Sequence, residues 1–206
     1  MTSLVGLKIQ NSTVAKWDRD AAVTNAHHPN LRVVRFYQVT PMDFPPLGLM
    51  VGKASFPAKL SSIDVCVSNL SSLPDETADQ WPNQMSLSLD HCGFLTMPPV
   101  LERMNLSGLS MAFNQIHDVP SSLIEKASLM SLQLSGNPIN ELPVVSQTSL
   151  KSLAVDFTNV TTCPSWLPST AVLYANNTPM CNHESGKSDS CKTMPDCAMY
   201  NVGRDR

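Results

Sequence analysis

Two small groups of side chains have the residue types for chemistry. His91 directly follows Asp90, and Asp64 is expected nearby; such groups can bind a metal or transfer protons. No serine in an elbow motif accompanies them, and no second histidine is in register. The pair His27-His28 has no cysteine or carboxylate at metal-ligand spacing. We therefore predict a non-enzyme with no catalytic residue, no metal and no cofactor, and we interpret the aspartates and His91 as a polar patch on a binding surface.

The six cysteines suggest a cap at the C-terminal end. Cys163, Cys181, Cys191 and Cys197 fall where the chain becomes polar and irregular, and disulfides could hold such a segment in place. Zinc is an alternative, since Cys181, His183, Cys191 and Cys197 could supply ligands, but the usual C-x₂₋₄-C pairs are missing. A third possibility is that these cysteines are reduced thiols. Cys66 and Cys92 are expected to be reduced, with Cys92 inward and Cys66 the more exposed.

A repeated spacing of apolar residues organises the chain. In LMSLQLSGNPINELP, residues 129–143, apolar positions occur at Leu129, Leu132, Leu134 and Ile139, and Asn137 marks a bend. This spacing is neither that of a helix nor that of a strand alone. Aligned copies place further bends at positions 12, 39, 68, 92, 114, 158 and 177, between 19 and 29 residues apart. The expected strands are 7–9, 34–36, 63–65, 87–89, 109–111, 132–134, 153–155 and 172–174.

The pattern resembles that of leucine-rich repeats, L-x-x-L-x-L-x-x-N/C-x-L with 20–29 residues in each unit. The resemblance implies an α/β solenoid, a horseshoe with one parallel sheet on its concave face and mostly irregular or 3₁₀ segments on its convex side. Residues 1–180 would form the array, with the last unit built on Val172, Tyr174 and Asn177. Residues 181–206 would form the Cys-rich cap and tail. The inward apolar residues would make one core, and inward Asn amides could donate to backbone carbonyls.

In such an array the outward strand residues line the concave face, the natural binding surface. We expect a basic and aromatic N-terminal end, acidic groups in the middle, and aromatic anchors toward the C-terminal end. The candidate ligand-binding residues are Lys8, Arg35, Tyr37, Asp64, Asp90, His91, Phe113, Gln133, Asp156 and Phe157. The expected partner is a protein, a peptide or a glycan. The outward residues of 129–143, Gly136 among them, look uninformative about function.

Composition and charge narrow the classes of partner. Only 15% of residues are charged, below the roughly 25% of typical soluble domains, and the net charge is −3. The chain has no basic run, so a nucleic-acid partner is not indicated. No stretch approaches the roughly 18 apolar residues of a membrane helix, and the first residues lack the features of a signal peptide.

Glycosylation sequons favour an extracellular location. They occur at Asn11, Asn69, Asn105, Asn159 and Asn176, a mild excess over chance. Because the chain opens inside a repeat, we interpret it as a fragment of a longer protein. Its style resembles extracellular ectodomains of oomycete surface proteins and receptor-like kinases, in which a membrane helix or a kinase usually follows. The alternative is a cytoplasmic scaffold of the same fold with reduced cysteines.

Overall fold

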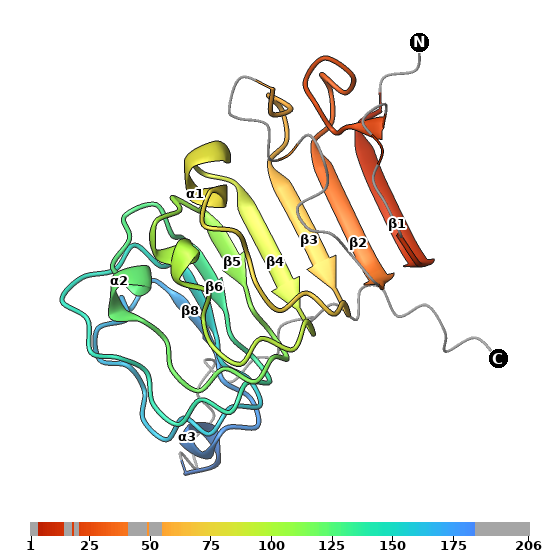
Figure 1. The fold of residues 1–206 in the computed structure, drawn as a ribbon. Helices are drawn as coiled ribbons and strands as arrows, with labels where there is room; N and C mark the ends of the chain where they lie inside the picture. The colour runs from red at the N-terminus through yellow and green to blue at the C-terminus, as the bar shows by residue number, and fades with distance from the viewer. Residues whose placement is uncertain (1–3, 15–17, 19–20, 41–48, 50–54, 184–206) are drawn as a thin grey trace.

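The fold is built on one sheet of parallel strands that follow one another in chain order (Figure 1). The computed structural model describes residues 4–14, 18, 21–40, 49 and 55–183. Within this part the strands are β1 Gly6–Ser12, β2 Val33–Val39, β3 Ser62–Cys66, β4 Ser86–Asp90, β5 Gly108–Ser110, β6 Ser131–Gln133, β7 Ser152–Ala154 and β8 Val172–Tyr174. Each pairs in parallel only with its sequence neighbours, which confirms the predicted solenoid.

Equivalent positions of the repeats stack in register. Leu132 pairs with Leu109 on one side and with Leu153 on the other. The first inward row is buried along the sheet: Val34, Ile63, Leu87, Leu109, Leu132, Leu153 and Leu173. The second inward row is buried too: Phe36, Val65, Leu89, Met111, Leu134, Val155 and Ala175. One unit could not shield these side chains alone, so stacking of neighbouring units buries them. Burying a large apolar side chain stabilises the fold by about 1.5–3 kcal/mol.

Two buried asparagines join successive turns. The Asn114 amide donates to the carbonyls of Leu89 and Met111, at 2.9 Å each, and its oxygen accepts from the backbone N–H of Cys92. Asn137 repeats the arrangement, donating at 2.8 Å to the carbonyls of Met111 and Leu134. Backbone groups that the bend would leave without partners are thereby satisfied inside the core.

The last repeat is offset by one residue from the sequence alignment. Val172 is exposed, whereas Leu173 and Ala175 are buried in the two inward rows. The bend residue of this unit is Thr178, whose hydroxyl donates to the Ala175 carbonyl at 2.6 Å. The predicted register, with Val172 and Tyr174 inward and Asn177 at the bend, is therefore wrong. A degenerate repeat offers two similar registers, and burial of Leu173 decides between them.

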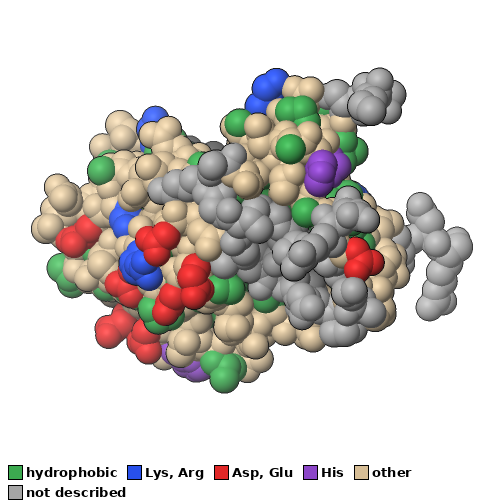
Figure 2. Space-filling view, turned by 45° about the horizontal axis from the view of Figure 1, so that its top comes forward, with side chains coloured by type: hydrophobic (Ala, Val, Ile, Leu, Met, Phe, Trp, Pro, Cys, Tyr) green, Lys and Arg blue, Asp and Glu red, His purple; other side chains and the backbone are tan. Residues whose placement is uncertain are grey.

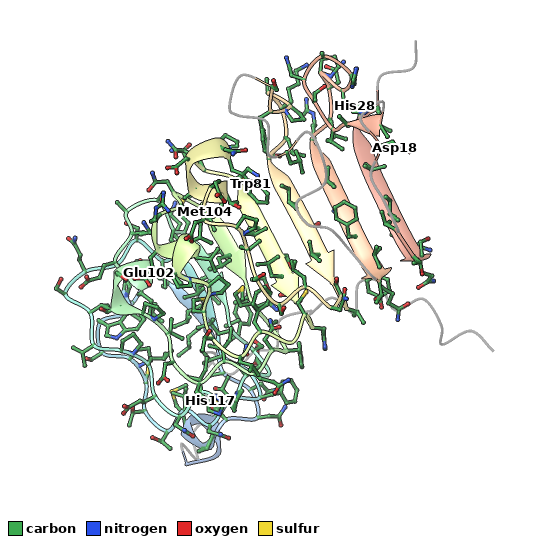
Figure 3. The ribbon with its side chains drawn as sticks, viewed as in Figure 1. Asp18, His28, Trp81, Glu102, Met104 and His117 are labelled. Carbon is green, nitrogen blue, oxygen red and sulfur yellow. The ribbon has the colours of Figure 1, made fainter. Side chains whose placement is uncertain are left out.

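Short helical turns and two tryptophans close the other side of the array. The helical elements are α1 Thr77–Gln80, η2 Pro99–Glu102, α2 Ser121–Ile124 and α3 Pro179–His183. Trp81 is buried beside α1, and its indole N–H donates to the Leu49 carbonyl at 2.9 Å (Figure 3). Trp166 makes the equivalent bond to the Pro143 carbonyl at 2.8 Å. Few regular helices were expected from the short connections; besides these elements, the described part of the chain has a 3₁₀ position at Ala21.

The C-terminal end of the described chain begins to cover the core. Met180 is buried, and Cys181 packs against the core beyond β8. The rest of the predicted cap, with Cys191 and Cys197, lies outside the described residues.

Candidate functional site

Three aromatic rings form a row where the strands end. His91 follows β4, Phe113 lies just beyond β5, and Phe157 lies just beyond β7. The rings of His91 and Phe113 stack with centroids 4.5 Å apart and planes 2° apart. The Phe157 ring follows with its centroid 6.5 Å from that of Phe113, tilted by 41°. We call these three residues the aromatic stripe; Phe157 is 52% exposed and is its most accessible member.

The stripe residues share a left-handed backbone conformation. His91, Phe113 and Phe157 have φ values of 52°, 54° and 56°. Every unit has a positive-φ residue just before its bend residue; the others are Asn11, Gln38, Val67, Gly136 and Asn177. For residues with a Cβ this conformation costs about 1–2 kcal/mol. It persists because the sheet ladder continues through it: the N–H of Phe113 donates to the Ser135 carbonyl at 2.7 Å.

Gly136 makes the stripe geometrically possible. It occupies the stripe's position in the intervening unit, with φ of +71°, and the Phe113 ring lies over it. A Cβ at this position would stand 2.4 Å from Cδ1 of Phe113, which is not a possible contact. Gly136, expected to be uninformative about function, thus has a steric role that its repeat pattern does not show. The glycine leaves the room in which Phe113 lies between His91 and Phe157.

Buried carboxylates support the stripe from beneath. Asp90 is 4% exposed; its Oδ1 accepts from the Ser110 hydroxyl at 2.6 Å and from the Ala112 N–H at 2.9 Å. Its Oδ2 accepts from the Ser88 hydroxyl at 2.8 Å. Burial raises the pKa of Asp90 above its ordinary value, and these hydrogen bonds oppose the rise. The carboxylate thus ties β4 to β5 directly beside His91.

Asp156 repeats this role beside Phe157. It is 1% exposed, and it accepts from the backbone N–H of Asn176 at 2.7 Å and from the Ser135 hydroxyl at 3.3 Å. Neither aspartate is therefore the accessible polar group that the sequence suggested. Both were predicted as ligand contacts, whereas their oxygens are used between neighbouring turns.

The N-terminal half of the sheet is less basic than expected. The guanidinium of Arg35 on β2 bonds to Oδ2 of Asp64 on β3 at 2.9 Å, and Ser62 donates to the other oxygen at 2.7 Å. Lys8 remains exposed, while Tyr37 is buried. A partly exposed pair of this kind adds little stability, about 0–1 kcal/mol. It does neutralise the charge that was expected to attract a partner.

Gln133 on β6 is only partly accessible. Its Nε2 is shielded from solvent and has no hydrogen-bond partner in the described part of the structure. Gln133 faces outward as expected, but its amide nitrogen is shielded, and an amide buried without a partner is costly.

The histidine, cysteine and carboxylate side chains of the described residues do not gather into a metal-binding group. No three His, Cys, Asp or Glu side chains there lie close enough together to hold a metal ion. Asp64 is bound by Arg35 on the strand before. His28 and His117 lie at opposite ends of the molecule (Figure 3). On the face drawn in Figure 2, acidic and basic side chains lie close together and hydrophobic ones are scattered.

Two of the four described cysteines, Cys66 and Cys163, differ from their predicted states, whereas Cys92 and Cys181 agree with theirs. Cys66, expected as an accessible thiol, is 3% exposed and disulfide-bonded; Cys181 is disulfide-bonded as well. Cys163, a disulfide candidate, is instead an exposed thiol. Cys92 is a buried thiol at its bend, and burial raises its pKa to about 12. The inward or outward position of a cysteine in its repeat therefore does not decide whether it is oxidised.

The predicted glycosylation sites are accessible. Asn11, Asn69, Asn105 and Asn159 are exposed, and Asn176 is half-buried. In the described chain no helix is long and apolar enough to cross a membrane. No protein-family model matches the sequence, and comparison with curated proteins finds no match.

The sequence identified the members of the stripe but not their arrangement. Phe113 and Phe157 were named as anchors and His91 as polar. The ring stack, the glycine beneath it and the serines that hold Asp90 were missed. One signal was available: the three aromatic residues and Gly136 occupy the same position of four successive repeats.

Proposed function

We propose that this chain is a non-enzymatic binding module of the leucine-rich-repeat class, a horseshoe that recognises a protein or peptide with its concave sheet face. The repeat pattern supports the class, together with the stacked inward rows and the buried amides of Asn114 and Asn137. The face opposite this core would be the concave one.

The observation that carries the proposal is the aromatic stripe. Its rings lie in one row because the left-handed residue just before the bend of each repeat is aromatic in three of four successive units. Phe157 offers an exposed apolar ring beside two rings already ordered by stacking. A preordered aromatic surface loses little conformational freedom on binding, which suits it to act as a binding hot spot.

The groups around the stripe favour a peptide over a sugar. A glycan site needs polar side chains that can bond to hydroxyl groups beside the aromatic ring. The nearest carboxylates, Asp90 and Asp156, are buried and bonded to serines and to backbone N–H groups. The stripe therefore fits an apolar or proline-containing segment of a protein.

A peptide library displayed on phage, panned against the purified chain, tests this function. Selected peptides would be synthesised and their affinities measured by calorimetry for the wild type, for Phe157→Ser and for Val144→Ser. Val144 is 91% exposed and lies outside the stripe, so it is the matched control. We expect about tenfold or greater loss for Phe157→Ser and no loss for Val144→Ser. Equal affinities for all three proteins, or binders found only on a glycan array, would overturn the proposal.

We further propose that the protein works outside the cell or at its surface. Exposed asparagines in sequons and the oxidised Cys66 and Cys181 support this location. The thiols at Cys92 and Cys163 are the observation that favours the alternative, a cytoplasmic scaffold. Thiol counting in natively purified protein without reductant separates the two: two reactive thiols after unfolding are expected, and six would overturn the extracellular location.

A further inference from the structure

The last repeat places an aromatic ring and a sequon asparagine on the same face of the sheet. Tyr174 ends β8, and the sequon Asn176-Asn177-Thr178 begins two residues later. Ala175 has no exposed surface, whereas Tyr174 and Asn176 on either side of it are half-buried, so both project to the face opposite the core. Residues two apart on an extended strand are about 6.6 Å apart. The Asn176 side chain therefore lies close to the Tyr174 ring.

The sheet holds the backbone of Asn176 on both of its polar groups. The N–H of Val155 donates to the Tyr174 carbonyl at 2.7 Å. The N–H of Phe157 donates to the Asn176 carbonyl at 2.9 Å, so the parallel ladder runs past the end of β8. Oδ1 of Asp156 accepts from the Asn176 N–H at 2.7 Å. The side-chain amide of Asn176 makes no hydrogen bond within the described residues, so its nitrogen is available for a covalent bond.

The other four sequons lack this arrangement. The residues two positions before their asparagines are Ile9, Val67, Arg103 and Phe157. Only Phe157 is aromatic, and the bend at Thr158 separates it from Asn159. The Thr158 hydroxyl marks this bend, since it donates inward to the Val155 carbonyl at 2.7 Å. Asn176 is thus the sequon asparagine whose aromatic neighbour lies on the same sheet face.

We propose that Asn176 carries an N-linked glycan whose first sugar packs on the ring of Tyr174. The C–H groups on one face of a pyranose are attracted to the negative face of an aromatic ring. A covalently attached sugar needs no polar side chains to orient it. The inference rests on the proposed extracellular location, because such glycans are added in the secretory pathway. It does not depend on peptide binding by the aromatic stripe.

The transfer joins the amide nitrogen of Asn176 to C1 of the first sugar of a lipid-linked oligosaccharide diphosphate. The bond from C1 to the diphosphate breaks, the lipid diphosphate leaves with the electron pair, and the amide nitrogen loses one proton. In the fold the sequon hydroxyl of Thr178 is buried and donates to the Ala175 carbonyl at 2.6 Å. The transfer therefore takes place before the last repeat folds, and the folded chain then holds the sugar on the outward face.

Site mapping tests the occupancy of Asn176. The chain would be secreted from cultured animal cells behind an added leader peptide, so that the result does not depend on its natural location. Release of the glycans by peptide-N-glycosidase in heavy-oxygen water converts each occupied asparagine to a heavy aspartate, which mass spectrometry locates. We expect Asn176 to be converted in most molecules. Conversion at other sequons but not at Asn176, or no conversion at all, would overturn the inference and leave the location to thiol counting.

Stability with and without the sugar tests the packing on Tyr174. A chain in which Asn176 holds the only glycan is made by changing the other sequon asparagines to glutamine: Asn11, Asn69, Asn105 and Asn159. The same chain from the bacterial periplasm, where disulfides form, carries no glycan and keeps Asn176. We expect the secreted chain to unfold at a higher urea concentration than the bacterial one. Tyr174→Phe should keep this difference, and Tyr174→Leu should abolish it.

Each variant is compared with its own unglycosylated form, so the direct effect of a substitution on folding cancels. Phe157→Leu is the matched control for a neighbouring aromatic ring and should keep the difference. A difference that survives Tyr174→Leu, or that Phe157→Leu abolishes, would show that the sugar packs elsewhere. A nuclear Overhauser contact between the Tyr174 ring and the first sugar needs no substitution; we expect it in the secreted chain, and its absence there would contradict the packing.

Discussion

The ring of Phe113 lies directly on the backbone of Gly136, in space that any larger residue would fill. A Cβ on Gly136 would approach Cδ1, Cε1 and Cγ of the ring to 2.4, 2.7 and 2.9 Å. The same ring stacks on His91 and adjoins Phe157. One glycine therefore controls the geometry of the whole aromatic stripe.

Gly136→Ala should destabilise the chain more than the same change at Gly93. Both glycines have positive φ, +71° and +79°, so alanine costs about 1 kcal/mol at each through the backbone alone. Only Gly136 has a ring over it; Gly93 has nothing within 4 Å. We expect a further loss of about 1–3 kcal/mol at position 136, measured by urea unfolding. In a Phe113→Ala background this extra loss should vanish; its persistence would show that the ring is not the obstacle.

Asn137→Ala should be among the most damaging polar substitutions. The change leaves the Leu134 carbonyl and the Ile116 N–H buried without the Asn137 partner, and it removes one of the two amide donors to the Met111 carbonyl, which keeps its bond from Asn114. We expect a loss of at least about 2 kcal/mol in the free energy of unfolding. Asn140→Ala, at an exposed position of the same repeat, should change it by less than about 0.5 kcal/mol. Similar values for the two variants would contradict the bonding role of Asn137.

Leu134 and Gln133 are adjacent and should respond in opposite ways. Leu134 has no exposed surface, so truncation to alanine should cost about 2–5 kcal/mol. Gln133→Met keeps the length of the side chain but removes the shielded amide that lacks a partner, so stability should stay the same or rise by up to about 1 kcal/mol. Denaturant midpoints of the two variants give the comparison. A large loss from Gln133→Met would mean that its amide has a partner in solution.

The Asp90 carboxyl should make stability depend on pH in an unusual direction. Burial raises the pKa of Asp90 in the folded chain above the ordinary 3.8. At a pH between 3.8 and the raised pKa, the folded chain therefore binds more protons than the unfolded chain. Its contribution to stability is therefore largest below the unfolded pKa and is lost as pH rises through the raised one. Asp90→Asn imitates the protonated form. Urea unfolding from pH 7 down toward pH 4 should show the wild type gaining stability relative to this variant, whereas a difference independent of pH would contradict the shift.

The repetitive part of the fold could be predicted because each repeat carries its own signal. Leucines at fixed spacing identify the inward rows, and Asn137 identifies the bend, so seven of the eight units can be placed from sequence. The eighth could not, because the alternatives in the Val172–Thr178 region differ by one residue. Only burial of Leu173 and Ala175 against the preceding turn distinguishes them.

The sequence predicted which residues belong to the candidate site but not how their side chains contact one another. Spacing places Asp90, Asp156, Phe113 and Phe157 on strand ends, but it does not show that the two carboxylates turn between strands to reach Ser110 and the Asn176 N–H. Such bonds join residues about twenty positions apart and depend on the exact stacking of two turns. The same holds for Arg35, whose charge is neutralised by Asp64 on the next strand.

The sequence by itself determined the solenoid, because apolar residues at a regular spacing can be buried only by stacking one turn on the next. Tertiary structure alone decided which outward residues remain accessible. Phe157 stays exposed, whereas Tyr37 and Cys66, on the same face, are covered. The physical reason is that burial on the outward face depends on contacts between turns and with other segments, and no pattern within one repeat records them.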